Sequence, residues 1–395
     1  MSAHLLYVGG EDHHLRIPFM LAMREHGFRV TAVGSGDAAP FNHAGLDFRR
    51  YHFNRYISPL SDWATLKELA KIIEDVNPDL AQGYDTKPCL FVPLASRLVG
   101  FPGAIRTICG RGWVYSSTSL LALAARPVYR LLHRTASFST AATVFEMDED
   151  RDFFERYRMT GQTGIAIPAG GGGVDVEGFE RALACSRSAG QVRKELGLGD
   201  SKVVITVTRM TRQKGIPTLL KAAAIVERMR PDVKFLLVGP RESEGPLAVT
   251  KAELERHSPY VKAVGPRSDI PALLNIADVF AFPTEYREGV PRVLLEASLA
   301  QVPIVSTNMP GCCEVVHQGS TGFLVPPFAP EALAQRILEM LDNREAAKSM
   351  AARAGELVRH KFSLTSIAAR HAALYSAILN SRHSSAPHLT VEQPL

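Results

Sequence analysis

Cysteine is scarce in this sequence and is not arranged as a scaffold. The number of cysteines is odd, and no two of them show a C-x-x-C spacing. This pattern argues against a disulfide framework or a zinc knuckle and favours a reducing cytosol. The cysteines are Cys89, Cys109, Cys185, Cys312 and Cys313.

Long apolar runs are also missing. The charge-free stretch from Gly112 to Ala125, which leans apolar, has only 14 residues, whereas a helix that spans a bilayer needs ~18 to 20. The short N-terminal run Leu5 to Val8 leads directly into a Gly-Gly-Glu-Asp loop, so we expect no signal peptide. The sequence predicts a cytoplasmic chain that does not cross a membrane unaided.

Several chemical motifs are absent as well. The glycines after the first predicted strand do not form G-x-G-x-x-G, which argues against a nicotinamide dehydrogenase. No H-x-x-x-H or H-E-x-x-H spacing accompanies His13 and His14, which could be bases, ligands or loop side chains facing solvent. No Asp-x-Asp motif stands where it could hold a divalent ion, because Asp148 to Asp150 follows a first-domain strand. We therefore expect neither a metal nor a cofactor.

The composition is that of a soluble globular protein. The chain has 395 residues, 46% of them hydrophobic and 22% charged, and a net charge of +5. That length is more than one compact core of ordinary size supports, so two domains are expected.

Short β-rich runs alternate with helical patterns in both halves of the chain. The first half opens with a predicted strand at 4–8, a helix at 17–26 and a strand at 28–33, and the second restarts with a strand at 202–208 and a helix at 216–229. We predict an α/β protein of two doubly wound Rossmann-like domains that face a central cleft, with C-terminal helices packing back toward the first domain. The predicted parts are an N-terminal acceptor-binding domain at 1–180, a nucleotide-sugar-binding domain at 190–361, a closing helix at 362–380 and a disordered tail at 381–395. The polar stretch 177–199 is interpreted as the interdomain region.

Two loops of the second domain carry the strongest chemical pattern. Glu288 lies in a strand-to-helix loop and Glu296 lies two turns into the following helix, so both carboxylates can accept hydrogen bonds from sugar hydroxyls. A solvated face of an amphipathic helix is the alternative for Glu296. Arg209 and Lys214 flank another such loop, where they could clamp a diphosphate or form a basic surface turn.

The C-terminal half resembles the retaining family-4 glycosyltransferases of the two-domain GT-B type. The resemblance covers about residues 200 to 345 and rests on the segments Arg209, Lys214-Gly215, Gly239-Pro240, Gly265 to Ile270, Ala277 to Phe280, Pro283, Glu288 to Glu296, Pro310-Gly311, Glu314 to Val316 and Gly322 to Pro327. The first half carries the segments Arg16-Ile17-Pro18, Lys87-Pro88, Gly110 to Tyr115 and Gly172 to Phe179. On these it looks like the branch that acts on lipid-linked oligosaccharides and surface polysaccharides.

The resemblance implies a retaining hexosyl- or N-acetylhexosaminyltransferase of cell-surface glycan synthesis. It would move a sugar from a nucleotide sugar, commonly a UDP-sugar, to a lipid-linked or polysaccharide acceptor without a metal. Arg209, Lys214 and Glu288 would be catalytic, with the two cations neutralising the diphosphate and Glu288 contacting the transferred sugar. The donor would also be bound by Gly10, Gly239, Arg267, Gly289, Val290, Pro291 and Glu296. The expected partners are this donor, a lipid-linked glycan acceptor and an anionic membrane surface, with no nucleic acid. A non-catalytic GT-B scaffold and a GT-B sugar-nucleotide epimerase are the alternatives.

The acceptor side departs from the family pattern, yet it has a charge signature of its own. No acidic residue occurs between Asp85 and Glu146, a stretch that carries seven basic residues. We predict that this face binds an anionic leaflet, which would attach the enzyme peripherally to the inner face of the plasma membrane. Helix capping or binding of the acceptor pyrophosphate is the alternative. The residues assigned to the acceptor or membrane side are His14, Arg16, Lys87, Arg111, Trp113, Arg126, Arg130 and Arg134.

Overall fold

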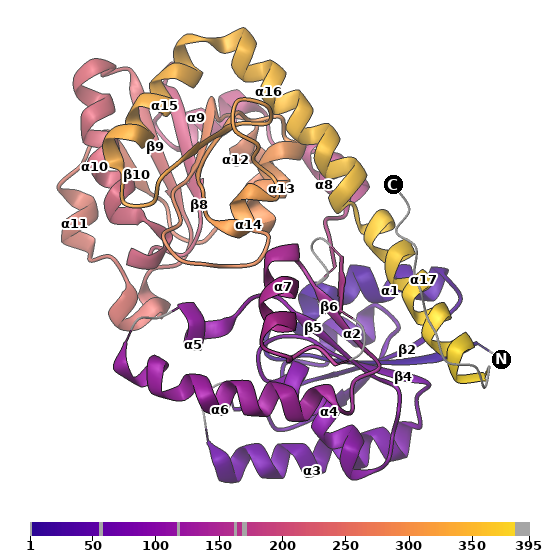
Figure 1. Ribbon diagram of the computed structural model, residues 1–395. Helices are drawn as coiled ribbons and strands as arrows, with labels where there is room; N and C mark the ends of the chain where they lie inside the picture. The colour runs from indigo at the N-terminus through magenta and orange to yellow at the C-terminus, as the bar shows by residue number, and fades with distance from the viewer. Residues whose placement is uncertain (1, 55–57, 117–118, 162–163, 168–171, 384–395) are drawn as a thin grey trace. The chain divides into compact units, whose positions relative to one another are not determined.

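The computed structural model describes residues 2–54, 58–116, 119–161, 164–167 and 172–383. It divides into two compact units, one made of residues 1–173 and 364–395 and the other of residues 174–363. Each unit is an α/β domain built on one parallel sheet (Figure 1). The predicted fold class is confirmed.

The first unit has a seven-stranded sheet with the order β3-β2-β1-β4-β5-β6-β7. All of its strand pairs are parallel, and β1 is an interior strand because it pairs with both β2 and β4. The strands are β1 (His4–Val8), β2 (Arg29–Gly34), β3 (Asp47–Arg50), β4 (Leu80–Gly83), β5 (Ala104–Ile108), β6 (Ala142–Phe145) and β7 (Gly164–Ala166).

Helices cover both faces of this sheet because its strands are apolar on both sides. Helices α1 (Ile17–Glu25) and α17 (Leu364–His383) pack together over one face. The other face carries α3 (Pro59–Val76), α4 (Pro88–Leu98), α6 (Leu120–Ser137) and α7 (Asp148–Arg156). The shorter helices are η1 (His13–Arg16), α2 (Ala39–His43) and α5 (Gly112–Ser116).

The closing helix predicted at 362–380 corresponds to α17, which belongs to the first unit. Tyr375 is fully buried there, and its hydroxyl hydrogen-bonds with Tyr7 and Gln82. Residues Ser381 to His383 of the predicted tail are helical, and its remaining residues, 384–395, lie outside the described part of the chain.

The second unit has a six-stranded parallel sheet with the order β10-β9-β8-β11-β12-β13. Helices α10 (Ile216–Met229) and α15 (Pro330–Asp342) share one hydrophobic core with the strands. On the opposite side lie α8 (Val176–Ala184), α12 (Ile270–Leu274), α13 (Arg292–Leu299) and α16 (Arg344–Leu357) (Figure 1). The strands are β8 (Lys202–Val207), β9 (Val233–Val238), β10 (Val261–Ala263), β11 (Val279–Phe282), β12 (Ile304–Thr307) and β13 (Phe323–Val325). The remaining helices are α9 (Ala189–Glu195), η2 (Arg212–Lys214), η3 (Glu242–Leu247), α11 (Lys251–Glu255), α14 (Pro310–Cys313) and η4 (Val358–Phe362).

The polar stretch 177–199 is not interdomain, because its helices α8 and α9 both belong to the second unit. Its polarity comes from exposed helix surfaces and from caps. Asp175 caps α8 by accepting from the Gly178 amide, and Ser188 and Gln191 form a capping box on α9. The chain passes between the units twice, after Gly173 and after Ser363.

Candidate functional site

The candidate donor site lies in the second unit, at the carboxyl ends of the neighbouring strands β8 and β11. The loop after β8 leads through η2 into α10, and the loop after β11 leads into α13. Ligands of open parallel sheets bind at this edge, so the two sequence motifs converge where a ligand is expected.

Lys214 and Glu288 are the two predicted residues that the structure brings into direct contact. The Lys214 ammonium Nζ lies 2.5 Å from Glu288 Oε2. The Lys214 residue is only 7% exposed and its ammonium faces the rings of Phe282 and Tyr286, at 5.4 and 4.9 Å from their centroids. A cation held by one carboxylate and two aromatic faces has a fixed position, which a diphosphate requires of its partner.

The second carboxylate oxygen of Glu288 is held as well. The Thr284 hydroxyl donates to Glu288 Oε1 at 2.8 Å, and Thr284 is completely buried. The carbonyl of Thr284 accepts from the Thr307 hydroxyl of β12 at 2.6 Å. The Glu288 carboxylate is therefore oriented from both sides, by Lys214 of the loop after β8 and by Thr284 of the loop after β11.

Two glycines let backbone segments come close at this edge. An added Cβ on Gly311 would stand 2.1 Å from the Gly289 carbonyl oxygen, and one on Gly239 would stand 1.9 Å from the Thr208 oxygen. Both distances are far below any real contact of a Cβ atom, so neither position accepts a side chain without backbone movement. Gly311 supports the Glu288 loop, and Gly239 lies beside the residue that precedes Arg209.

Glu296 lies in α13 and is paired with Arg292 across one helical turn, at 3.1 Å. Burial raises the pKa of the Glu296 carboxyl above its usual range, and Arg292 only partly offsets that effect. Gly289, Val290 and Pro291 form the entry to this helix, which starts at Arg292 with no side-chain cap. The first turn of α13 thus offers uncapped amides, a feature that favours anions.

The other two predicted donor-site cations are placed differently. Arg209 follows β8 and is exposed. Arg267 is held in a surface cluster, 2.8 Å from both Asp269 and Glu195. Its guanidinium is therefore occupied by carboxylates rather than joined to the Lys214 and Glu288 pair.

In the first unit, Gly10 and Arg16 both bind Asp85. The Gly10 amide donates to Asp85 Oδ2 at 3.1 Å, and Arg16 donates to Oδ1 at 2.8 Å. Burial by itself would raise the pKa of Asp85, but Arg16 and the Gly10 amide together hold it below its usual value. His14 lies in η1 with an exposed side chain. Its neighbour His13 is buried against the Tyr7 carbonyl, and burial lowers its pKa to about 3.

The predicted acceptor-side cations are also paired with carboxylates. Lys87 lies 2.6 Å from Asp62 on α3, and Arg111 lies 2.7 Å from Asp150 and 3.1 Å from Glu149 on α7. The stretch between Asp85 and Glu146 contains no acidic residue, but in the folded structure carboxylates from α3 and α7 lie next to its basic residues. Trp113 belongs to α5, and its side chain lies outside the described part of the structure.

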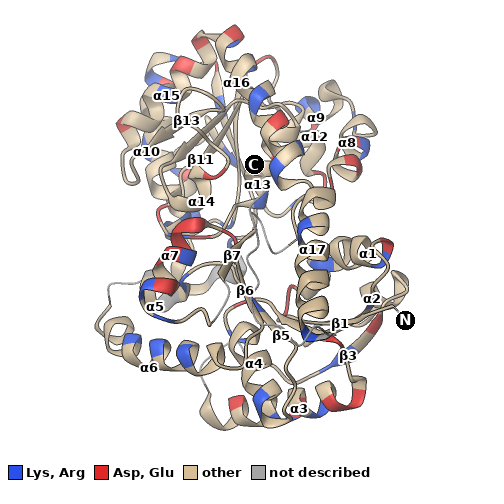
Figure 2. Cartoon of the chain, turned by 45° about the vertical axis from the view of Figure 1, so that its right-hand side comes forward, with Lys and Arg blue, Asp and Glu red and all other residues tan. Residues whose placement is uncertain are grey.

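The arginines of α6 contact neighbouring helices and loops. Arg126 donates to the Val114 carbonyl and Arg130 donates to the Tyr115 hydroxyl at 2.6 Å. Arg130 also lies 3.9 Å from the centroid of the Tyr157 ring, and Arg134 donates to the Tyr157 carbonyl. In Figure 2 the basic positions of α6 occur without acidic ones on the same helix.

Residues 2–383, as far as they are described, contain no cluster of three His, Cys, Asp or Glu side chains that could hold a metal ion. None of the helices in the same residues is both long and apolar enough to cross a bilayer.

Two family models match the chain, one in each unit. Residues 4–142 match "Glycosyl transferase 4-like", and residues 189–356 match "Glycosyl transferases group 1". A glycosyltransferase from Rickettsia africae superposes with a TM-score of 0.77 at 19% identity, covering 96% of this chain and 99% of that one. The chain is a GT-B glycosyltransferase.

Among the curated relatives of this glycosyltransferase is a Campylobacter jejuni enzyme named N,N'-diacetylbacillosaminyl-diphospho-undecaprenol alpha-1,3-N-acetylgalactosaminyltransferase. It is 25% identical over 95% of this chain and 98% of its own length. An Escherichia coli enzyme named UDP-Gal:alpha-D-GlcNAc-diphosphoundecaprenol alpha-1,3-galactosyltransferase is 26% identical over 73% of each chain. Anabaena HepE, crystallised with UDP-glucose, has a TM-score of 0.76 at 19% identity, covering 95% of this chain and 100% of that one.

Some contacts of the glycosyltransferase could not be inferred from its motifs. Thr284 stands next to Pro283 of the family motif, and a hydroxyl residue two positions after a buried strand was the one available signal for it. The partners Asp62 and Asp150 come from helices far away in the sequence, and no local pattern connects them with Lys87 or Arg111.

Proposed function

We propose that this glycosyltransferase moves a sugar from a UDP-sugar to a lipid-linked acceptor with retention of the anomeric configuration and without a metal. The observation that carries the proposal is the contact between Lys214 and Glu288 at the carboxyl edge of the second sheet. It joins the two chemical groups that the reaction needs, a cation for the leaving diphosphate and a carboxylate for the transferred sugar.

In this proposal Lys214 exchanges its contact with Glu288 for the diphosphate of the donor. Negative charge accumulates on the diphosphate as the glycosidic bond to the sugar breaks, and a cation fixed in advance stabilises it without reorganisation. Arg209 and the uncapped amides of α13 add positive potential to the same edge. These groups supply the charge that a divalent ion would otherwise supply.

A lipid-linked acceptor is supported by two relatives whose names contain diphospho-undecaprenol. One of them aligns over nearly its full length, so the similarity includes the first unit and not only the donor motifs. We assign the acceptor to the first unit, where Arg16 and Asp85 lie at the carboxyl edge of the sheet, and the product to cell-surface glycan synthesis.

A UDP donor is supported by the Escherichia coli relative, whose name specifies UDP-Gal and which matches 73% of the chain. Mycobacterium tuberculosis relatives named for GDP-mannose match 50% of it. We place the enzyme at the cytoplasmic face of the plasma membrane as a peripheral protein, because an undecaprenol-linked acceptor is confined to a bilayer.

The proposal is tested with the full-length chain and a panel of nucleotide sugars. A donor at 100 times its Kd stabilises the fold by about 2.7 kcal/mol, which a thermal-shift assay detects. The stabilising donor is then incubated with an undecaprenyl-diphosphate sugar in detergent, with and without EDTA. We expect transfer that EDTA does not affect, a product with the donor's anomeric configuration by NMR, and loss of transfer in Lys214→Ala.

Other outcomes identify the competing functions. Donor binding without turnover on any lipid-linked acceptor would favour a scaffold, and interconversion of the donor sugar without an acceptor would favour an epimerase. A UDP-sugar panel that leaves the melting temperature unchanged would contradict the donor assignment.

A further inference from the structure

A large pocket lies in the first unit at the edge opposite to the candidate acceptor site. Its volume is about 1290 Å³, and it is lined by the end of α4, the end of α6, the end of α7 and the loops that lead into β5, β6 and β7. Pro102 and Ala141, which precede β5 and β6, belong to its wall. The pocket is therefore at the amino ends of the strands, whereas Gly10 and Asp85 follow their carboxyl ends.

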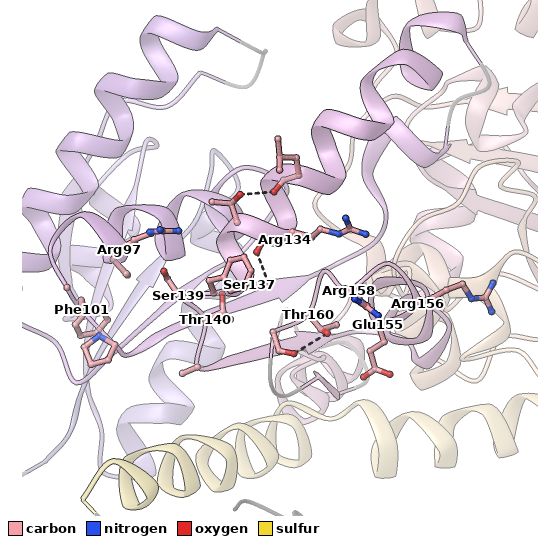
Figure 3. A pocket seen from close by; sticks show the side chains of 18 residues that line it. Arg97, Phe101, Arg134, Ser137, Ser139, Thr140, Glu155, Arg156, Arg158 and Thr160 are labelled. Atoms are coloured by element: carbon pink, nitrogen blue, oxygen red, sulfur yellow. Dashed lines mark hydrogen bonds between the residues drawn. The ribbon is translucent and has the colours of Figure 1, made fainter. Parts of the chain in front are cut away.

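The charged side chains around this pocket are mostly arginines. Arg97 lies on one side, and Arg134, Arg156 and Arg158 lie on the other, with Glu155 as the only acidic residue among those that line it (Figure 3). Within the described residues, no carboxylate pairs with Arg97, Arg156 or Arg158, and all three are exposed. Such a set of guanidinium groups is suited to a phosphate.

Two buried groups next to these arginines also favour the binding of a phosphate. Ser96 lines the pocket and is completely buried, and its hydroxyl has no hydrogen-bond partner in the described structure. Arg106 is fully buried behind the wall and donates to the Thr143 hydroxyl and to the carbonyls of His133 and Met159. Its charge is met by dipoles alone in the described structure, so it adds a positive potential behind the pocket.

The rim of the pocket is apolar and exposed, and it continues along α6. Leu131 is 64% exposed and Phe138 is 83% exposed, and both line the pocket. At 100° per residue, the outward face of α6 is mostly apolar, with Thr135 as its polar member. The large ones on that face are Leu120, Leu121, Val128, Leu131 and Leu132.

A helix face without a charged residue, bordered by arginines, is typical of a surface that lies in the interface of a membrane. The arginines Arg126 and Arg130 stand on the flank of α6, between its buried and its outward faces, where they hold Tyr115 and Tyr157. The helix has 18 residues, so it extends for ~27 Å from the acceptor edge of the sheet to the pocket.

We propose that the pocket binds the phosphate of an anionic phospholipid while the outward face of α6 lies in the interfacial layer of the leaflet. The exposed leucines contact acyl chains, and the arginines around the pocket bind the headgroup. Because α6 connects the two edges of the sheet, a lipid held at one end keeps the acceptor edge close to the leaflet at the other. The proposal relies on the function proposed above only for the presence of a membrane.

Arginines at the ends of α4, α6 and α7 also stabilise the helix dipoles, and the test has to separate that role from lipid binding. The full-length chain is sedimented with vesicles of phosphatidylcholine alone or of phosphatidylcholine with phosphatidylglycerol, in the absence of donor and acceptor. The double variant Arg97→Gln, Arg158→Gln is compared with Arg228→Gln, Arg256→Gln, which removes the same charge from exposed sites in the second unit.

We expect wild type to bind the anionic vesicles and the pocket variant to bind them about fivefold more weakly for each arginine removed, with little change in the control. Leu121→Gln with Val128→Gln should weaken binding to both kinds of vesicle. All variants should keep the wild-type melting temperature, and the pocket variant should keep transfer in detergent, where no leaflet is present.

Three results would overturn the proposal. The first is equal vesicle binding by the pocket variant and the control variant. The second is a pocket variant that melts at a lower temperature than wild type but binds vesicles as well as wild type does, because the arginines would then only stabilise the helix dipoles. The third is a thermal shift with inorganic phosphate that depends on Arg97 and Arg158 while wild type ignores vesicles, because the pocket would then take a free anion. A failure of sugar transfer in detergent would instead contradict the function proposed above and leave this vesicle result unaffected.

Discussion

The ammonium of Lys214 and the carboxylate of Glu288 form an ion pair at 2.5 Å, although 74 positions separate them in the sequence. Their side chains are 9% and 17% exposed, so each charge depends on the other for much of its stabilisation. This pair occupies the place where the donor diphosphate is proposed to bind.

Replacing Lys214 should affect catalysis and stability separately. Lys214→Ala should lower kcat/KM by on the order of 10²- to 10³-fold, because it removes a cation aimed at the leaving group. It should also lower the free energy of unfolding by about 1–3 kcal/mol, since the Glu288 carboxylate is left without its cation. Chemical denaturation of Lys214→Ala, Glu288→Gln and the double variant measures the coupling. A double variant as unstable as the sum of the single ones would contradict a stabilising pair.

Thr284 should act as a positioning residue for Glu288. Thr284→Val keeps the shape but removes the hydroxyl that donates to Glu288 Oε1. We expect roughly a tenfold loss of kcat from one hydrogen bond to a charged group, with a smaller change in the donor KM. Thr284→Ser keeps the hydroxyl and should retain most of the activity. Equal activity of the valine and serine variants would show that Glu288 does not need this contact.

Gly311 should tolerate no side chain, because an added Cβ would stand 2.1 Å from the Gly289 carbonyl oxygen. Gly311→Ala must displace the Glu288 loop and should reduce both the melting temperature and the turnover. Gly190 in α9 is the matched control, since a Cβ there meets no atom within 4 Å. Gly190→Ala should leave turnover unchanged and stabilise the helix by up to about 1 kcal/mol. Wild-type turnover in Gly311→Ala would show that the loop can move without loss.

The first unit should lose stability in mild acid before the second unit does. Burial lowers the pKa of His13 to about 3 and that of His371 to about 4, from a usual value of 6.5. Between pH 6.5 and about 4 the unfolded chain therefore binds protons that the folded chain does not, and stability falls as the pH falls. Each histidine contributes about 1.4 kcal/mol per pH unit in that window.

Hydrogen exchange at pH 7 and pH 5 measures this difference for each unit. The fully buried histidines in the described residues, among them His133, all belong to the first unit, so its core amides should lose protection first. His371→Leu should reduce the pH dependence of the melting temperature. An equal loss of protection in both units would contradict the assignment to these histidines.

The alternation of strands and helices could be read from the sequence because each element carries its own apolar pattern. The predicted strand at 4–8 has those bounds in the structure, and so does the predicted helix at 216–229. The stretch 177–199 was misread because its helices are short and exposed, and their caps resemble turn residues. The charge-free part of α6 was recognised, but its apolar face points outward and does not follow the buried pattern of the other helices.

The pairing of charges could not be read in the same way. Arg106 looks like any other basic residue of its stretch, yet it is fully buried in β5, because strands of a parallel sheet are covered on both faces. Lys87 and Arg111 find their carboxylates on α3 and α7. Proximity between distant segments depends on strand order, and a single sequence does not specify the order β1-β4-β5-β6 in a local pattern.

The place of α17 sets an order of events during translation. Residues 174–363 are continuous in the chain, so the ribosome delivers the whole second unit before any residue of α17. The first unit is completed later, because Ile367 and Tyr375 fill its core and are synthesised only after the whole second unit. The synthesis of the first unit therefore begins before that of the second unit but is completed after it. Until α17 has been synthesised, the sheet face that α1 and α17 cover together remains partly exposed and accessible to chaperones.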